Sequence, residues 1–195
     1  MIKLGITSPM GGGKTYVSRI FQELGVPIFN TDESARRILN SNTELRSEIC
    51  KEFGNIYDDD GVIIPTLLRS IVYIEGAEDE LKKLNSLVHP HVFKEYVLFC
   101  EKNRDKIYTI AESAILFESG MDNIIDDVIY VQADEETRIR RTFERSGFSR
   151  EEYGQRMKSQ LPEEKKLQIS KFVIKNNDCD DVEGQVKDID RILNG

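Results

Sequence analysis

The sequence predicts an α/β protein in which a parallel sheet is interrupted by two helical insertions. Three observations point to this class. Short apolar runs recur along the chain as candidate strands, and a glycine-rich loop and an amphipathic helix join the first two. The stretch between the second and third runs has helical apolar spacing. A basic, charged stretch of helical character precedes the last run.

The core elements follow in order along the chain. Residues 2–7 form the first apolar run, and a helix should begin at Lys14 and end at Gly25. Residues 26–29 form the second run, and Asp32 stands at the end of this strand in FNTD. Further strands are expected at residues 107–112, 128–131 and 172–174, before a closing helix at residues 182–193.

The two insertions divide the chain into three predicted parts. The core comprises residues 1–32, 106–136 and 168–195, the helical insertion residues 33–105, and a helical lid residues 137–167. In the helical insertion, DDDG at residues 58–61 reads as a turn, and Pro90 should break or restart the helix that contains it. This layout is typical of small phosphotransferases, with one insertion for the acceptor and one lid.

Composition excludes several classes of function. The net charge of −8 makes nucleic acid an improbable partner, whereas residues 138–166 hold nine basic and five acidic side chains, which suits a small polyanion. No apolar run approaches the roughly 20 residues that cross a bilayer, and no secretory leader is expected. The three cysteines, Cys50, Cys100 and Cys179, are far apart in the sequence and predict a reducing, cytoplasmic location. No Cys/His pair has the spacing of a structural zinc site.

The stretch SPMGGGKT at residues 8–15 has the end of a phosphate-binding loop. In such a loop, backbone N–H groups and a helix N-terminus converge on phosphate oxygens. Lys14 would neutralise phosphate charge, and the Thr15 hydroxyl would bind Mg²⁺. Ser8 and Pro9 depart from the usual spacing, but the residues nearer the lysine keep their donors: Gly11, Gly12, Gly13, Lys14, Thr15 and Tyr16. The alternative is a glycine-rich turn that caps an ordinary helix.

Two carboxylates are candidates for catalysis and metal binding. Asp32 would meet a ligand crevice at the end of a strand, where it could orient or deprotonate an attacking hydroxyl. It could equally be a helix N-cap before residues 33–40. Glu112 ends the strand YTIAE and could reach Mg²⁺ through water, or be an ordinary surface carboxylate.

Basic and aromatic side chains supply further candidates. Arg141 and Arg145 lie four residues apart on one helix face, and clustered guanidinium groups suit phosphate. The alternative is a solvated helix whose arginines pair with Glu144 or Glu136. His89 precedes Pro90 at an expected helix start, so it is either a cap or a substrate contact.

Seven segments, in this order, resemble the dephospho-CoA kinase family nearly end to end. They are GITSPMGGGKT, LGVPIFNTDESARRIL, FGNIYDDDG, LNSLVHPHV, ESAILFESG, RTFERSGFSREEYGQRMKSQ and VIKNN. The resemblance implies a P-loop core, a helical substrate domain at residues 33–105 and a lid. It also implies transfer of the ATP γ-phosphoryl group to the ribose 3′-hydroxyl of dephospho-CoA, with Mg²⁺.

The resemblance assigns roles to individual residues. Lys14 stabilises the transferring group, Asp32 is the catalytic base beside the substrate, and Arg141 acts in catalysis. Arg141 and Arg145 are lid residues that close on phosphates. Asn176 lies near the nucleotide base, and His89 in the substrate domain.

Departures from the family pattern keep alternatives open. Ser8 and Pro9 replace two glycines, Ile64-Pro65 stands where Asp-Arg is usual, and Glu112 and Ala114 replace Asp and Pro. Another small-molecule kinase on the same scaffold, or a non-catalytic nucleotide-binding relative, remains an alternative. The expected assembly is a monomer or a small homo-oligomer.

Overall fold

The computed structural model describes residues 1–72, 76–158 and 160–195. The chain divides into two compact units, one of Met1–Asn30 with Cys100–Gly195 and one of Thr31–Phe99. The insertion and the lid expected at residues 33–105 and 137–167 each include residues outside this description, namely 73–75 and 159.

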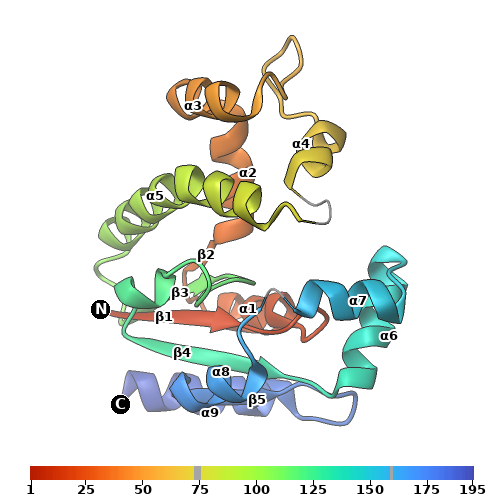
Figure 1. Cartoon of the computed structure of the whole chain (residues 1–195). Coiled ribbons are helices and arrows are strands. Elements are labelled where there is room, and N and C mark those ends of the chain that lie inside the picture. The colour runs from red at the N-terminus through yellow and green to blue at the C-terminus, as the bar shows by residue number, and fades with distance from the viewer. Residues whose placement is uncertain (73–75, 159) are drawn as a thin grey trace. The chain divides into compact units, whose positions relative to one another are not determined.

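The first unit is built on a parallel sheet of five strands in the order β2-β3-β1-β4-β5 (Figure 1). The strands are β1 (Ile2–Thr7), β2 (Ile28–Asn30), β3 (Tyr108–Glu112), β4 (Asp127–Gln132) and β5 (Phe172–Lys175). All five lie within two residues of the predicted runs. Because the central strands carry apolar side chains on both faces, they read as continuous hydrophobic runs.

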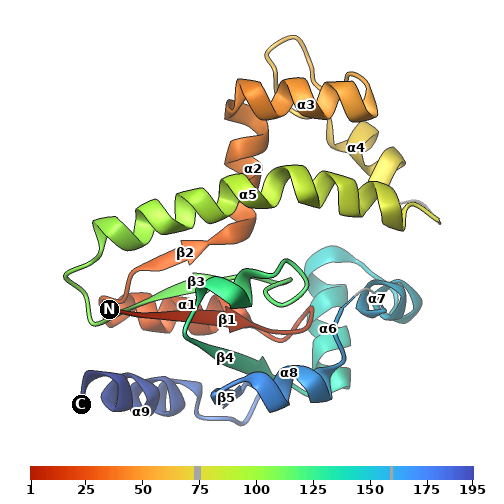
Figure 2. The same ribbon diagram turned by 60° about the vertical axis from the view of Figure 1, so that its left-hand side comes forward.

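Helices and a long loop cover the two faces of this sheet (Figures 1 and 2). On one face, α1 (Lys14–Glu23) packs on β1 and β3, and α9 (Val182–Asn194) packs on α1 and β5, with Leu4, Ile6 and Phe21 fully buried in the shared core. On the other face, Leu116 from the loop after β3 lies directly over Gly5. The remaining elements of this unit are η1 (Met121–Ile124), α6 (Glu135–Ser146), α7 (Arg150–Met157) and α8 (Glu163–Ile169).

The second unit is helical. It contains α2 (Thr31–Ser41), α3 (Thr43–Phe53), α4 (Pro65–Val72) and most of α5 (Glu78–Lys102). Asn42 caps α3 by accepting a hydrogen bond from the Leu45 amide at 3.0 Å. The predicted turn at residues 58–61 is present, since the Gly61 amide donates to Asp58 O and Tyr57 pairs with Ile63 in an antiparallel bridge.

Two expectations about helix boundaries are wrong. Pro90 does not break its helix but lies inside α5, where the buried side chains of Val88 and Val92 on either side hold the helix together despite the missing amide donor. His89 is therefore an interior helical residue and not a cap. The second strand ends at Asn30, so Asp32 is neither a strand residue nor an N-cap but lies in the first turn of α2.

Among the helices formed by the described residues, none is both long and apolar enough to span a membrane.

Candidate functional site

The site begins at the loop between β1 and α1. Gly11 and Gly13 adopt left-handed backbone angles, with φ of 81° and 93°. The Gly12 amide donates to Pro9 O at 2.9 Å, and the buried Ser8 hydroxyl also donates to Pro9 O at 2.9 Å. The two residues that depart from the usual loop spacing therefore form the turn that closes this loop.

Glycine is required at two loop positions because other chain segments approach closely. A Cβ at Gly11 would lie 2.4 Å from Arg138 O, and a Cβ at Gly13 would lie 2.1 Å from Asn176 Nδ2. Both distances are shorter than any ordinary carbon contact. The loop thus fits tightly between α6 and the residues that follow β5.

Backbone amides at the loop and at the start of α1 form a set of hydrogen-bond donors. In the described part of the chain, four of them have no recorded acceptor: those of Gly11, Gly13, Lys14 and Thr15. The amides of Gly12 and Tyr16 instead donate to Pro9 O and Gly13 O, and the Tyr16 ring is half exposed. Unsatisfied amides at a helix N-terminus are the donors that phosphate oxygens need.

Three side chains converge beside these amides. The Thr15 hydroxyl donates to Glu112 Oε1 at 2.5 Å, and Lys14 Nζ lies 3.9 Å from the same oxygen. Glu112 is the last residue of β3 and is only 3% exposed, so it is not the surface carboxylate of the alternative interpretation. The strand register brings it there, because Ile6 of β1 pairs with Glu112.

A hydroxyl and a carboxylate in contact suit Mg²⁺, which prefers oxygen ligands and keeps several waters. The described residues contain no group of three or more His, Cys, Asp or Glu side chains that could hold a metal alone. The oxygens of Thr15 and Glu112 are therefore of the kind that could hold a magnesium ion.

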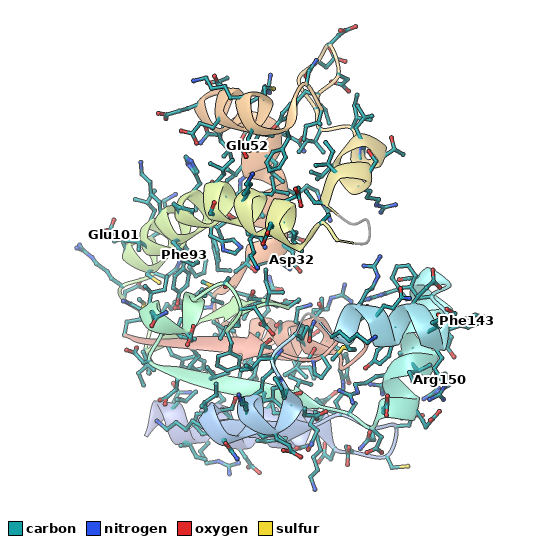
Figure 3. All side chains as sticks on the ribbon, viewed as in Figure 1. Asp32, Glu52, Phe93, Glu101, Phe143 and Arg150 are labelled. Atoms are coloured by element: carbon teal, nitrogen blue, oxygen red, sulfur yellow. The ribbon has the colours of Figure 1, made fainter. Side chains whose placement is uncertain are left out.

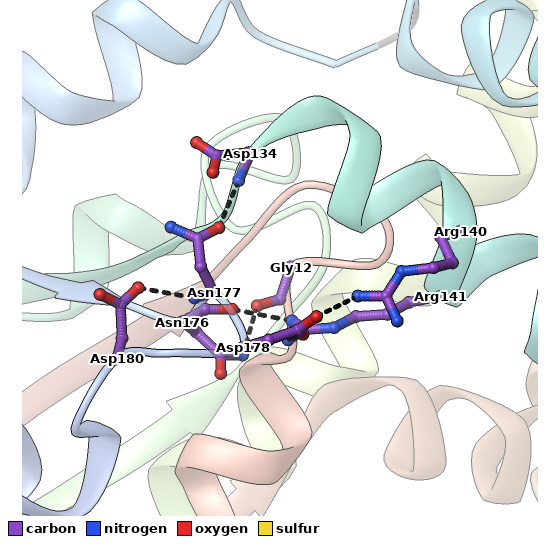
Figure 4. Close-up of polar contacts among 8 residues, drawn as sticks. All are labelled: Gly12, Asp134, Arg140, Arg141, Asn176, Asn177, Asp178 and Asp180. Atoms are coloured by element: carbon purple, nitrogen blue, oxygen red, sulfur yellow. Dashed lines mark hydrogen bonds and ion pairs between the residues drawn. The ribbon is translucent and has the colours of Figure 1, made fainter.

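Asn176 and Arg141 tie this loop to its surroundings (Figure 4). Asn176 is buried, and its side-chain amide donates to Gly12 O at 2.8 Å. Arg141 Nη1 donates to Asn176 O at 2.8 Å, and its Nη2 donates to Asp178 Oδ1 at 3.0 Å. Arg140 donates to the other oxygen of Asp178 at 2.5 Å. Hydrogen bonding to Arg141 and the nearby guanidinium charges hold the pKa of Asp178 below its usual value.

The expected basic face of α6 consists of arginines in different environments. Arg138 is buried and donates to Glu163 at 3.0 Å, whereas Arg145 is exposed in the last turn of α6. Arg150, from α7, pairs with Glu136. Neither Arg141 nor Arg145 has a recorded ion pair with Glu136 or Glu144 among the described residues, so the solvated-pair alternative is not what the structure has.

The two candidates in the helical unit have fewer defined contacts. Asp32 is exposed in the first turn of α2 (Figure 3). His89 stacks on Phe93 at 6.0 Å between ring centroids, and burial lowers the pKa of His89. The ordered polar contacts of this unit lie elsewhere, since Glu95 accepts from the Ser34 hydroxyl at 2.6 Å and also pairs with Arg37.

Sequence analysis missed Asp178 and the buried Lys166. Asp178 lies in the acidic run NNDCDD, and nothing in this run indicates that it pairs with Arg140 and Arg141, which are far away in the sequence. Lys166 lies in a stretch whose charge predicts a solvated helix, yet its side chain is 1% exposed and its Nζ lies 2.9 Å from Glu118 Oε1. Only the three-dimensional fold brings these partners together.

The parallel sheet, the glycine loop between β1 and α1, and the Lys14-Thr15 pair define a P-loop nucleotide-binding α/β protein of the kinase type. The family model described as dephospho-CoA kinase matches residues 2–181. The chain therefore belongs to the dephospho-CoA kinase family.

Individual relatives agree with this membership. The chain is 36% identical over 184 residues to dephospho-CoA kinase of Carboxydothermus hydrogenoformans, covering 89% of this chain and 85% of that protein. It is 33% identical over 177 residues to that of Bacteroides fragilis, covering 90% and 85%. Among solved structures, dephospho-CoA kinase from Campylobacter jejuni aligns with a TM-score of 0.71 at 26% identity, over 99% of this chain and 98% of that one.

Proposed function

We propose that this protein transfers the γ-phosphoryl group of ATP to the 3′-hydroxyl of dephospho-CoA, giving CoA and ADP. The observation that carries the proposal is the set of amides at Gly11, Gly13, Lys14 and Thr15 that have no acceptor among the described residues, in a chain that belongs to this family. Such a set suits the phosphates of ATP better than a simple helix cap would.

Residues of the loop hold the nucleotide in this proposal. The free amides and Lys14 Nζ bind the β- and γ-phosphates, and Tyr16 and Gly12 complete the loop around them. Thr15 and Glu112 would hold Mg²⁺, which when bound would neutralise part of the phosphate charge. The buried Asn176 lies on the side of the loop proposed for the nucleotide base.

Asp32 is the proposed base at the acceptor. The 3′-oxygen attacks the γ-phosphorus, the bond from that phosphorus to the β,γ-bridging oxygen breaks, and the hydroxyl proton passes to the Asp32 carboxylate. ADP leaves with the bridging oxygen. Support comes from the chemistry of an exposed carboxylate in the first turn of α2, the helix that follows β2. His89 is the proposed contact of the helical insertion, residues 33–105, with dephospho-CoA.

Arginines of the lid, residues 137–167, are proposed to complete the site. Arg145 is exposed at the end of α6, so its guanidinium group is available to a phosphate. Arg141 is held near Gly13 by Asn176 and Asp178, and in this position it would stabilise charge on the transferring group. The free thiols of Cys50, Cys100 and Cys179 suit the reducing cytoplasm.

The test is ADP release with Mg-ATP and dephospho-CoA, beside AMP, CMP, shikimate and no acceptor. We expect ADP only with dephospho-CoA, with CoA formed in equal amount. ADP formed equally well with another acceptor would indicate a different small-molecule kinase. No turnover with any acceptor, from a folded protein that binds ATP, would leave a non-catalytic nucleotide-binding relative.

A Lys14→Ala variant tests the loop itself. It should bind ATP more weakly and lose nearly all transfer, because the ammonium group meets charge that develops on the γ-phosphoryl group. ATP affinity by isothermal titration and turnover by ADP release are the measurements. Unchanged activity would mean that the loop does not hold the reacting phosphates.

A further inference from the structure

A lysine that is almost completely buried lies outside the residues assigned to catalysis. The side chain of Lys166, in α8, is 1% exposed. Its Nζ lies 2.9 Å from Glu118 Oε1 and 3.4 Å from Gln160 Oε1. Lysine is almost never this buried unless it is paired, and removing it from water costs free energy that the ion pair must offset. Such an arrangement calls for a reason beyond stability.

Glu118 connects two chain segments that are far apart in sequence. The oxygen that meets Lys166 also accepts the Leu161 amide at 2.7 Å. Glu118 itself lies in the loop that follows Glu112, and Leu116 of the same loop is completely buried over Gly5. Glu118 therefore fastens residues 161–166 to a loop that is fixed on the sheet.

A second ion pair fastens the start of α8. Glu163 accepts from Arg138 at 3.0 Å and from Gln132 at 3.3 Å. Arg138 is the residue whose backbone lies against Gly11 of the phosphate loop. Hence α8 is held at two points. Glu163 pairs with Arg138, whose backbone lies against the phosphate loop, and Lys166 pairs with Glu118 in the loop that follows β3.

These contacts bear on the position of the lid arginine. After the buried Thr142 of α6 the chain passes the exposed Arg145, α7 buries Tyr153, and Leu161 then donates its amide to Glu118. Glu118 binds the Leu161 amide at this point and also pairs with Lys166. A shift of about 1 Å in a charged group can cost a large part of its effect on a transition state.

We propose that Glu118 and Lys166 are positioning residues that fix the return of the lid, so that its arginines meet the transferring phosphate in the right place. The inference rests on the proposed kinase function. Neither residue is among those proposed to bind ATP or dephospho-CoA. Their loss should therefore reduce the rate of transfer more than the binding of ATP, which the loop amides and Lys14 hold.

The test uses Lys166→Met, which keeps the length of the side chain and leaves Glu118 bonded to Leu161. We expect kcat to fall about tenfold, with KM for ATP within about twofold of the wild type. Lys171→Met is the matched control, because Lys171 pairs with Asp127 by an exposed ion pair beside β5. That variant should keep wild-type kinetics.

The double variant Lys166→Met with Glu118→Gln distinguishes a loss of positioning from a loss of stability. It removes both charges but keeps an oxygen for the Leu161 amide, and we expect a thermal midpoint near that of the wild type with the same loss of kcat. Hydrogen exchange gives a second readout that does not need turnover. Amides of residues 147–158 should exchange faster in both variants, while those of the phosphate loop stay unchanged.

Each result decides between positioning and packing. Wild-type kcat and wild-type exchange in Lys166→Met would overturn the proposal. The proposal would also be overturned if amides throughout the first unit exchanged faster and kcat fell in proportion to the active fraction. That result would indicate a purely structural role for the pair. If the wild type shows no turnover, the proposed function fails, and the exchange of residues 147–158 alone decides whether this pair positions the lid.

Discussion

The two compact units present their candidate residues in opposite ways. In the first unit, which holds the phosphate loop, candidates such as Thr15 and Glu112, or Asn176 and Gly12, contact one another, although Arg145 is exposed. In the helical unit, Asp32 is exposed, and ordered polar contacts such as Ser34 with Glu95 involve other residues.

This difference follows from what each unit is proposed to bind. Polyphosphate carries concentrated charge, and a site for it needs donors and cations that are fixed before binding. An acceptor hydroxyl needs one carboxylate at the right place, and that carboxylate requires no network of its own. ATP binding by the first unit should therefore be sensitive to substitutions that change the shape of the loop. Turnover should be sensitive to substitutions that change the chemistry of Asp32.

The largest effect is expected at Asp32. Asp32→Asn keeps the size of the side chain but removes the base, and kcat should fall about 10²- to 10⁴-fold while ATP binding is retained. Steady-state ADP release and calorimetric ATP titration measure the two quantities. Glu33→Gln, at the next position of α2, is the control and should keep activity. Full turnover in Asp32→Asn would show that Asp32 is not the base, and the helical unit would then have no proposed chemical role.

The next effect concerns shape, at Gly13. Gly13→Ala adds a methyl group 2.1 Å from Asn176 Nδ2 at a φ of +93°, so the loop must move, and ATP affinity should fall at least about tenfold. Calorimetric titration with ATP measures the change.

Gly25→Ala is the matched control for Gly13→Ala. Gly25 has a similar φ of +85° at the other end of α1, but nothing lies within 4 Å of its Cβ position. Ala there should lower stability by about 1–2 kcal/mol through backbone strain alone and leave ATP binding intact. Equal loss of ATP affinity in both variants would show that strain in α1, and not the contact with Asn176, controls the loop.

Much of the first unit could be predicted because its central strands are buried on both faces. The run at residues 2–7 became β1, and Gly25 follows the end of α1 as expected. Local patterns were less reliable where distant packing decides. Pro90 stays inside α5 because Val88 and Val92 are buried on either side of it.

The candidate site divides in the same way. The loop and its lysine could be recognised from consecutive residues, since the donors are neighbours in the chain. The partners of Asp178 and Lys166 could not, because each ion pair joins segments that only the fold brings together. The roles of all the candidate site residues stay predictions, and Asp32, His89 and Arg145 have the fewest contacts from which a role could be argued.

A smaller effect is expected at Asp178, which holds Arg141 beside the loop. Asp178→Asn removes an exposed carboxylate, and exposed ion pairs contribute little, so kcat should fall only about two- to fivefold. Because contacts with Arg141 lower the pKa of Asp178, its contribution is complete at neutral pH and is lost only in acid, as pH falls through the folded pKa. ADP release at pH 7.5 measures the change, with Asp180→Asn as the control in the same loop. A loss as large as that of Asp32→Asn would place Asp178 in the reaction itself.

The smallest effect is a pH dependence of stability at His89. Burial lowers its pKa from the ordinary 6.5, so the unfolded chain binds the proton more readily than the folded one. Stability from this group is therefore complete above about pH 6.5 and is lost as pH falls through the lower folded pKa. The thermal midpoint should fall less between pH 7 and pH 5 in His89→Gln than in the wild type, by about 1–3 °C. Calorimetry across this range measures it, with His91→Gln as the control. An identical pH profile in His89→Gln and wild type would mean that the ring titrates as in water, and His89 would then be open to solvent and to substrate alike.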